Sequence, residues 1–119
     1  MTATPPPFLV RIIDQSADSD DNVVEDIGPF ETVEDANLFA RRYVRDSVER
    51  CRAQGMTGKQ VLDAWFAFGE DATVPDADGA WTSATELADF AERRARMADR
   101  DWRSLDPRLH GSDEEPDEA

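Results

Sequence analysis

The longest apolar pattern in the chain, over residues 32–55, predicts its main helix. Apolar side chains recur there every three or four positions, which is the spacing of one face of an α-helix. They are Val33, Ala36, Phe39, Ala40, Tyr43, Val44, Val48 and Cys51. Thr32 and Asp35 resemble a capping box, and Gly55 suits the residue that closes a helix. We therefore expect the rest of the fold to cover this face.

The opposite face of this predicted helix carries charges of both signs. Its members are Arg41, Arg42, Arg45, Arg52, Asp46 and Glu49. Some stand one turn from an opposite charge, as in Arg42–Asp46, Arg45–Glu49 and Asp46–Arg50. Such pairs stabilise a helix by about 0.2–0.5 kcal/mol each. The arginines could bind an anion, but the interleaved acids favour a solvated, self-paired face.

Two shorter stretches before this helix predict a β-hairpin. Residues 8–13 are apolar on both faces, which is typical of a central strand. Residues 22–27 form the second strand, with Val23, Val24 and Ile27 as its apolar positions. An acidic loop over residues 14–21 joins the two strands.

Residues 57–69 fit two different elements. Trp65, Phe66 and Phe68 favour a strand over residues 64–69, because aromatic side chains suit pleated surfaces. Thr57 and Gln60 could instead cap a helix that runs to Phe66. We prefer the strand and keep the helix as the alternative.

A second helix is predicted over residues 83–105. Ser83 and Glu86 form its capping box, and Asp106 with Pro107 stops it. Its apolar face holds Leu87, Ala88, Ala91, Ala95, Ala98 and Trp102.

These elements predict a small two-layer α+β sandwich. A right-handed crossover gives a three-stranded, mainly antiparallel sheet in the order 2-1-3, with the elements in ββαβα order and both helices on one face. The expected core holds Val10, Ile12, Phe39, Tyr43, Phe66 and Leu87. Residues 8–105 form the single domain, residues 1–7 a disordered lead-in and residues 106–119 an acidic disordered tail.

Composition adds a strong charge bias. The chain has 119 residues and a formal net charge of −14, from 27 acids against 13 bases. This size allows one modest core and no large buried cleft. The charge repels nucleic acid and anionic membranes and attracts basic proteins. Adaptation to high salt and GC-rich coding, suggested by the single lysine, Lys59, are competing explanations of the acidity.

The candidates for site chemistry are few, and we expect no metal, no cofactor and no enzymatic activity. Cys51 is the only cysteine and suits a buried apolar position. His110 falls in the predicted tail, without the partner that catalysis needs. Residues 76–79 resemble part of a calcium loop, but Val74 and Thr85 stand where acidic ligands are required.

Glu70 and Asp71 follow the aromatic stretch directly. A carboxyl at the end of such a strand could have a raised pKa and act as an acid or base. It could equally cap the last amides of the strand. No leader sequence and no apolar run near the ~18 residues of a membrane span are visible, so we expect a cytoplasmic location.

These observations favour a small acidic, non-enzymatic protein-binding module that acts as an accessory or regulatory partner of a protein with a basic surface. The candidate partner-binding residues are Trp81, Trp102, Asp18, Asp20, Asp21, Glu70 and Asp71. The acidic loops 14–21 and 70–79 should leave opposite ends of the sheet, which disfavours one compact acidic patch. One alternative is an acidic nucleic-acid mimic that inhibits a DNA- or RNA-handling protein. Another is a small acid–base enzyme using Glu70 or Asp71. No oligomeric state is predicted.

Overall fold

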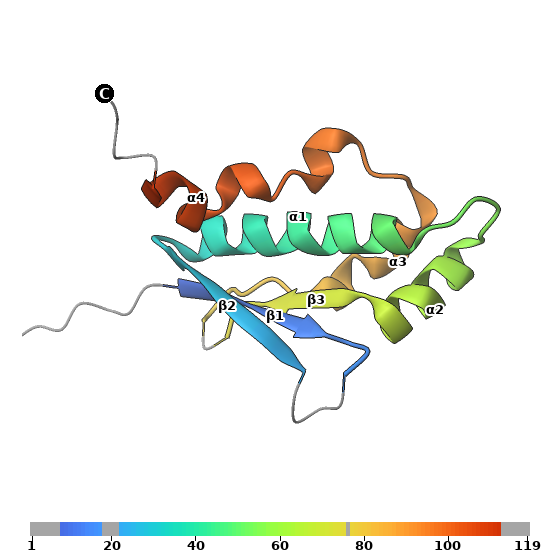
Figure 1. The fold of residues 1–119 in the computed structure, drawn as a ribbon, viewed down its shortest axis with the longest axis horizontal. Helices are drawn as coiled ribbons and strands as arrows, with labels where there is room; N and C mark the ends of the chain where they lie inside the picture. The colour runs from blue at the N-terminus through green and yellow to red at the C-terminus, as the bar shows by residue number, and fades with distance from the viewer. Residues whose placement is uncertain (1–7, 18–21, 76, 113–119) are drawn as a thin grey trace, which may run out of the picture.

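A three-stranded antiparallel sheet in the order β2-β1-β3 forms the base of the fold (Figure 1). The computed structural model describes residues 8–17, 22–75 and 77–112. The strands are β1 (Phe8–Asp14), β2 (Val23–Phe30) and β3 (Glu70–Thr73). The predicted α+β class and the 2-1-3 strand order are confirmed.

Helix α1 (Val33–Cys51) crosses one face of this sheet. The Thr32 hydroxyl accepts a hydrogen bond from the Asp35 N–H at 3.0 Å, which is the predicted N-terminal cap. The helix ends earlier than expected, because Arg52 rather than Gly55 is its C-terminal cap. Its apolar stripe meets the inner side of the sheet in one core, which includes Val10, Ile12, Ile27, Phe39, Val44 and Leu87.

The predicted strand over residues 64–69 is wrong, and the alternative helix is present as α2 (Gly58–Phe68). Its first turn is capped reciprocally: the Thr57 hydroxyl accepts from the Gln60 N–H, and the Gln60 side chain accepts from the Thr57 N–H. Val61 and Trp65, one turn apart, are both buried. Capping and packing therefore outweigh the preference of aromatic residues for strands.

This change moves the third strand to residues 70–73 and alters the core. Phe66 is 53% exposed, whereas Trp65 is 1% exposed and takes the place that we expected for Phe66. The Trp65 indole N–H donates to the Ser47 hydroxyl at 3.1 Å, so its polar atom is satisfied inside the core. Tyr43, also expected in the core, is only partly buried.

The predicted helix over residues 83–105 is broken into short pieces. They are η1 (Ser83–Thr85), α3 (Leu87–Glu92), η2 (Met97–Arg100), η3 (Arg103–Leu105) and, beyond the predicted end, α4 (Pro107–Ser112).

Side chains from α1 explain where α3 stops. In a continued helix the Ala95 N–H would donate to the Ala91 carbonyl. The Ala95 N–H donates instead to the Glu49 carboxylate at 3.1 Å. The Ala91 carbonyl accepts from the Arg52 guanidinium at 3.0 Å. Because both backbone groups are already paired with Glu49 of α1 and with its cap residue Arg52, the chain can leave the helix without losing hydrogen bonds.

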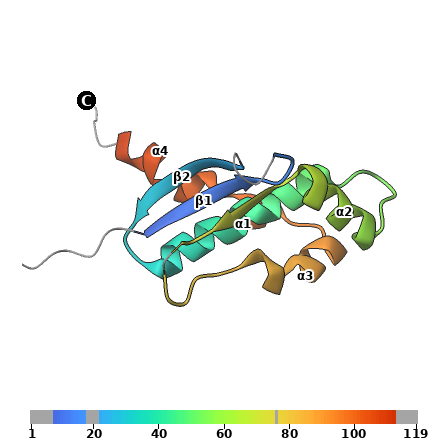
Figure 2. The same cartoon turned by 90° about the horizontal axis from the view of Figure 1, so that it is seen from below.

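The segment after α3 covers α1 from the side opposite the sheet, and α3 lies beside α1 (Figures 1 and 2). Trp102 packs there on Phe39 and Tyr43, with ring centroids 5.8 and 4.9 Å apart. The expected solvated face of α1 is therefore wrong: Arg45 and Asp46 are 7% and 8% exposed. Of the three predicted helical pairs, the structure shows Asp46–Arg50, at 3.4 Å.

Helix α4 places part of the predicted tail in the folded body. Asp106 is 1% exposed. The Arg108 guanidinium forms salt bridges with Asp106 at 2.7 Å and with Glu25 of β2 at 3.0 Å. These contacts lie in the stretch from residue 106 onward that we predicted as an acidic tail. Residues 1–7 and 113–119 lie outside the described residues. No helix in the described part of the chain combines the length and apolar character that crossing a membrane requires.

Candidate functional site

Two acidic stretches meet at one end of the sheet. Asp14 and Glu70 are register partners across β1 and β3, and Ile13 pairs with Asp71. The expectation that the loops 14–21 and 70–79 leave opposite ends is wrong for Glu70 and Asp71, because Glu70 begins β3 instead of following a strand. Beyond Thr73, which pairs with Arg11, the chain leaves β3 toward the other end of the sheet. The predicted residues Asp18, Asp20 and Asp21, which follow β1, lie outside the described residues.

The hairpin is fixed to the end of α2 at this point. The Gln15 N–H donates to the Gly69 carbonyl at 3.0 Å, and its side-chain amide donates to the Trp65 carbonyl at 2.9 Å. The Gly69 carbonyl belongs to the C-terminal cap of α2, and the Trp65 carbonyl accepts this bond in addition to the one from the Gly69 N–H. The ends of β1 and α2 therefore lie side by side (Figure 1).

Two phenylalanines are exposed on the last turn of α2. Val61, Trp65 and Phe68 share one helical face at the spacing i, i+4, i+7. The first two are buried, but Phe68 is 75% exposed. Phe66 is 53% exposed, and its ring packs edge-on to Trp65 at 5.0 Å. The apolar face of α2 thus continues past the body into solvent.

Phe68 shares a hollow of about 270 Å³ with two carboxylates, those of Asp14 and Glu70. Its other lining residues are Ser16, Ser47, Arg50, Cys51 and Gly69. Substrate pockets usually measure about 300–1,000 Å³, so this volume suits a surface contact better than an enclosed ligand. We call Asp14, Phe66, Phe68 and Glu70 the hairpin end.

Both carboxylates of the hairpin end are held by neighbouring groups. The Ser16 hydroxyl and N–H donate to Asp14 at 2.7 and 2.9 Å, and these bonds lower the pKa of Asp14. The Tyr43 hydroxyl donates to Glu70 at 2.5 Å. Burial, and then this bond, raises the pKa of Tyr43 well above its usual range. The two acids therefore present their charge in fixed positions.

Asp71 lies near Glu70 in sequence but not in the same recess. Burial raises the pKa of Asp71, while hydrogen bonds from the Ser83 hydroxyl and the Ala72 N–H act in the opposite direction. The hollow that Glu70 lines does not include Asp71. The two carboxyl groups therefore do not converge as the acid and base of one site.

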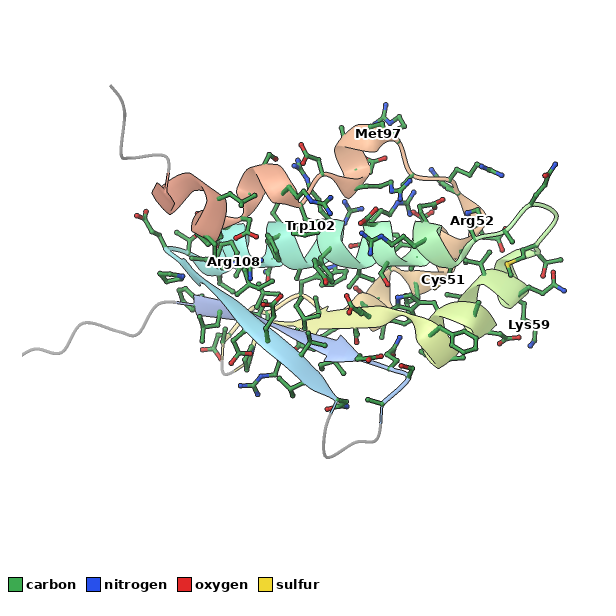
Figure 3. The ribbon with its side chains drawn as sticks, in the orientation of Figure 1. Cys51, Arg52, Lys59, Met97, Trp102 and Arg108 are labelled. Atoms are coloured by element: carbon green, nitrogen blue, oxygen red, sulfur yellow. The ribbon has the colours of Figure 1, made fainter. Side chains whose placement is uncertain are left out.

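The two predicted tryptophan anchors are used within the chain. The Trp102 indole N–H donates to Asp46 at 3.1 Å, and its ring lies against α1 (Figure 3). The Trp81 indole N–H donates to Glu86 at 2.7 Å, and its ring stacks on Phe90 at 6.5 Å. Both side chains are half-buried.

Two sequence candidates remain, the Cys51 thiol and the stretch that resembles part of a calcium loop. Burial raises the pKa of the Cys51 thiol, which favours the protonated form. Asp76 lies outside the described residues. Within the described part of the chain, no group of three or more histidine, cysteine, aspartate or glutamate side chains is placed to hold a metal ion.

Sequence reasoning missed Phe68 because it was assigned to a strand. The signal was present in the i, i+4, i+7 spacing of Val61, Trp65 and Phe68, which points to one helical face.

Comparisons of the chain with models of protein families, with curated proteins and with solved structures give no match.

Proposed function

We propose that this chain is a small acidic, non-enzymatic protein-binding module, an accessory or regulatory partner that works in the cytoplasm. It binds a basic protein surface through the hairpin end. The observation that supports this proposal is the 75% exposure of Phe68 beside the carboxylates of Asp14 and Glu70.

Arginine is the partner residue that this arrangement suits best. A guanidinium can stack on an aromatic ring and at the same time pair with a carboxylate. Exposed aromatic side chains are also enriched among the residues that dominate binding energy. The net charge of −14 attracts a basic partner from a distance, and Asp18, Asp20 and Asp21, which follow β1 in the sequence, contribute to that charge.

The nucleic-acid mimic is the competing function, and the placement of Glu70 and Asp71 beside the end of β1 favours it. A mimic needs carboxylates at phosphate-like positions and has no need for an aromatic ring. The requirement for Phe68 therefore separates the two functions.

Surface plasmon resonance on a partner captured from the native cell tests the proposal. Phe68→Ala should weaken binding by about 2 kcal/mol or more, through faster dissociation. Met97→Ala is the matched control, because Met97 is 82% exposed but lies on the far side of α1 from the sheet (Figure 3). It should leave the kinetics unchanged.

Neutralising Asp18, Asp20 and Asp21 together should mainly slow association and flatten its dependence on salt. If this triple change abolishes binding while Phe68→Ala leaves the affinity unchanged, the nucleic-acid mimic becomes the better-supported function.

A further inference from the structure

A pocket rich in arginine lies between α1, α3 and η2, on different elements from the hairpin end. Its volume is about 330 Å³, and it is lined by Arg41, Arg45, Asp89, Arg93, Arg94, Arg96 and Asp99. Five arginines against two aspartates give this lining a formal charge of +3. The chain as a whole carries −14, so the pocket runs against the general charge of the molecule.

Ion pairs account for only part of this positive charge. Arg41 pairs with Glu86 at 2.7 Å, outside the lining. The two lining aspartates are also engaged, as Arg93–Asp89 at 3.0 Å and Arg96–Asp99 at 3.6 Å. Among the described residues, the structure shows no ion pair for Arg45 or Arg94. Arg45 acts at longer range on Glu49, Glu86 and Asp99 and helps to lower the pKa of each carboxyl, but none of the three forms an ion pair with it.

Arg45 carries the strongest indication of a missing acceptor. The residue is 7% exposed, its Nη2 donates to the Arg93 carbonyl at 3.1 Å, and its guanidinium lies 4.6 Å from the centroid of the Phe90 ring. Its Nη1 is buried and has no hydrogen-bond partner in the described structure. A guanidinium stays charged, and buried donors are nearly always paired. An oxyanion would supply both the acceptor and the opposite charge.

We propose that this pocket binds the phosphate group of a small phosphorylated molecule. The planar fork of arginine matches phosphate oxygens in a bidentate way. The volume lies at the lower end of the roughly 300–1,000 Å³ of small-molecule pockets, which leaves room for a small organic part.

The rim of the pocket can open to such a ligand. The side chains of Arg93 and Arg96 are 75% and 87% exposed, so their heads can move aside while Arg45 stays in place on Phe90. A bound phosphate would then bridge α1 to residues 93–96, the connection between α3 and η2.

Isothermal titration calorimetry on the full chain tests this proposal, with inorganic phosphate, phenyl phosphate and acetate as probes. Sodium chloride keeps the ionic strength equal throughout, because screening alone changes the affinity of exposed charges. Both phosphate probes should bind, and acetate, with one charge and two oxygens, should bind at least about tenfold more weakly. Tighter binding of phenyl phosphate identifies an organic phosphomonoester as the ligand. Equal affinity would mean that the pocket recognises the phosphate group alone, with no contribution from the organic part.

Substitutions of lining residues test whether the measured heat of binding comes from this pocket. Arg45→Met should abolish binding, and Arg94→Met should weaken it about tenfold, the loss of one charge-assisted contact. Lys59→Met removes one positive charge on α2, outside the pocket lining, and should bind as the original chain does (Figure 3). If Arg45→Met fails to fold, Arg94→Met alone tests the proposal, because Arg94 is exposed and its replacement should leave the fold intact.

Three results would overturn the proposal: no heat with either phosphate probe, acetate binding as tightly as phosphate, or Arg94→Met binding with the original affinity. None of these results bears on the hairpin end, which is tested through Phe68.

Discussion

Asp14 and Glu70 face each other as register partners of β1 and β3, and both line the hollow beside Phe68. Like charges placed opposite each other destabilise a sheet. The chain keeps both and supplies each with a neutral donor, the Ser16 hydroxyl for Asp14 and the Tyr43 hydroxyl for Glu70. A positive charge on a bound partner would offset the repulsion between the Asp14 and Glu70 carboxylates. This is the physical reason why we place the binding surface at the hairpin end.

The first prediction concerns which face of α2 is buried. Trp65→Ala should lower the free energy of unfolding by about 3–5 kcal/mol, because the side chain is buried and leaves a large cavity. Phe66→Ala, one residue on, should cost less than about 1 kcal/mol, because half of that side chain is already in water. Urea melts of the two variants check this. Equal losses would mean that the helix presents another face to the core.

A second prediction concerns the attachment of the C-terminal segment to α1. Asp46 accepts from Arg100 at 2.7 Å and from the Trp102 indole at 3.1 Å. Asp46→Asn should therefore cost about 1.5–3 kcal/mol, the range for hydrogen bonds to a charged group.

The control for this prediction is Asp63→Asn. Asp63 pairs with Lys59, but the two side chains are 63% and 83% exposed, so the loss should stay below about 1 kcal/mol. Urea denaturation measures both variants. An Asp46→Asn loss no larger than that of the control would show that the segment is held by its apolar contacts alone.

The raised pKa of Tyr43 predicts how stability depends on pH. The free tyrosine pKa is about 10, and burial together with Glu70 raises the pKa of Tyr43 above it. Between these two values the unfolded chain loses a proton that the folded chain keeps. Stability should therefore be complete below about pH 10 and fall as the pH rises toward the folded pKa.

Tyr43→Phe removes this group and should flatten the alkaline loss in urea melts. Tyr43 is the only tyrosine, so the ultraviolet absorbance of tyrosinate reports its ionisation directly. Ionisation of the folded chain at the pH of free tyrosine would contradict the half-buried Tyr43–Glu70 bond.

Truncation tests where the folded part ends. Removing residues 106–119 deletes the buried Asp106 and the Arg108–Glu25 pair, and should lower the thermal midpoint clearly. Removing only residues 113–119 should leave the midpoint nearly unchanged, because that stretch is acidic and lacks the apolar residues that offset ordering entropy. Equal midpoints for the two truncations would mean that the folded domain ends before residue 106, as predicted from the sequence.

Part of the fold was predictable from sequence. The stripe of α1, its Thr32 cap and the strand order follow from spacing and crossover rules that act locally. Residues 57–69 were not predictable, because a helix cap and the strand preference of three aromatic side chains pointed to different elements. Burial of Val61 and Trp65 against the rest of the fold decided between them.

The end of α3 depended on contacts that no local pattern contains. Arg52 and Glu49 bond the backbone of residues 90–95 across about 40 positions of sequence. The same wrapping buried Arg45, which looks like a solvated helix position when α1 is considered alone. The arginine pocket and the hairpin end both arise from such long-range placement.

The most direct test of the central claim compares what three baits capture from the native cell: the original chain, Phe68→Ala and Met97→Ala. Quantitative mass spectrometry should show a basic protein captured by the original chain and by Met97→Ala, and lost or strongly reduced with Phe68→Ala. Capture of the same protein in equal amounts by all three baits would contradict binding through the hairpin end.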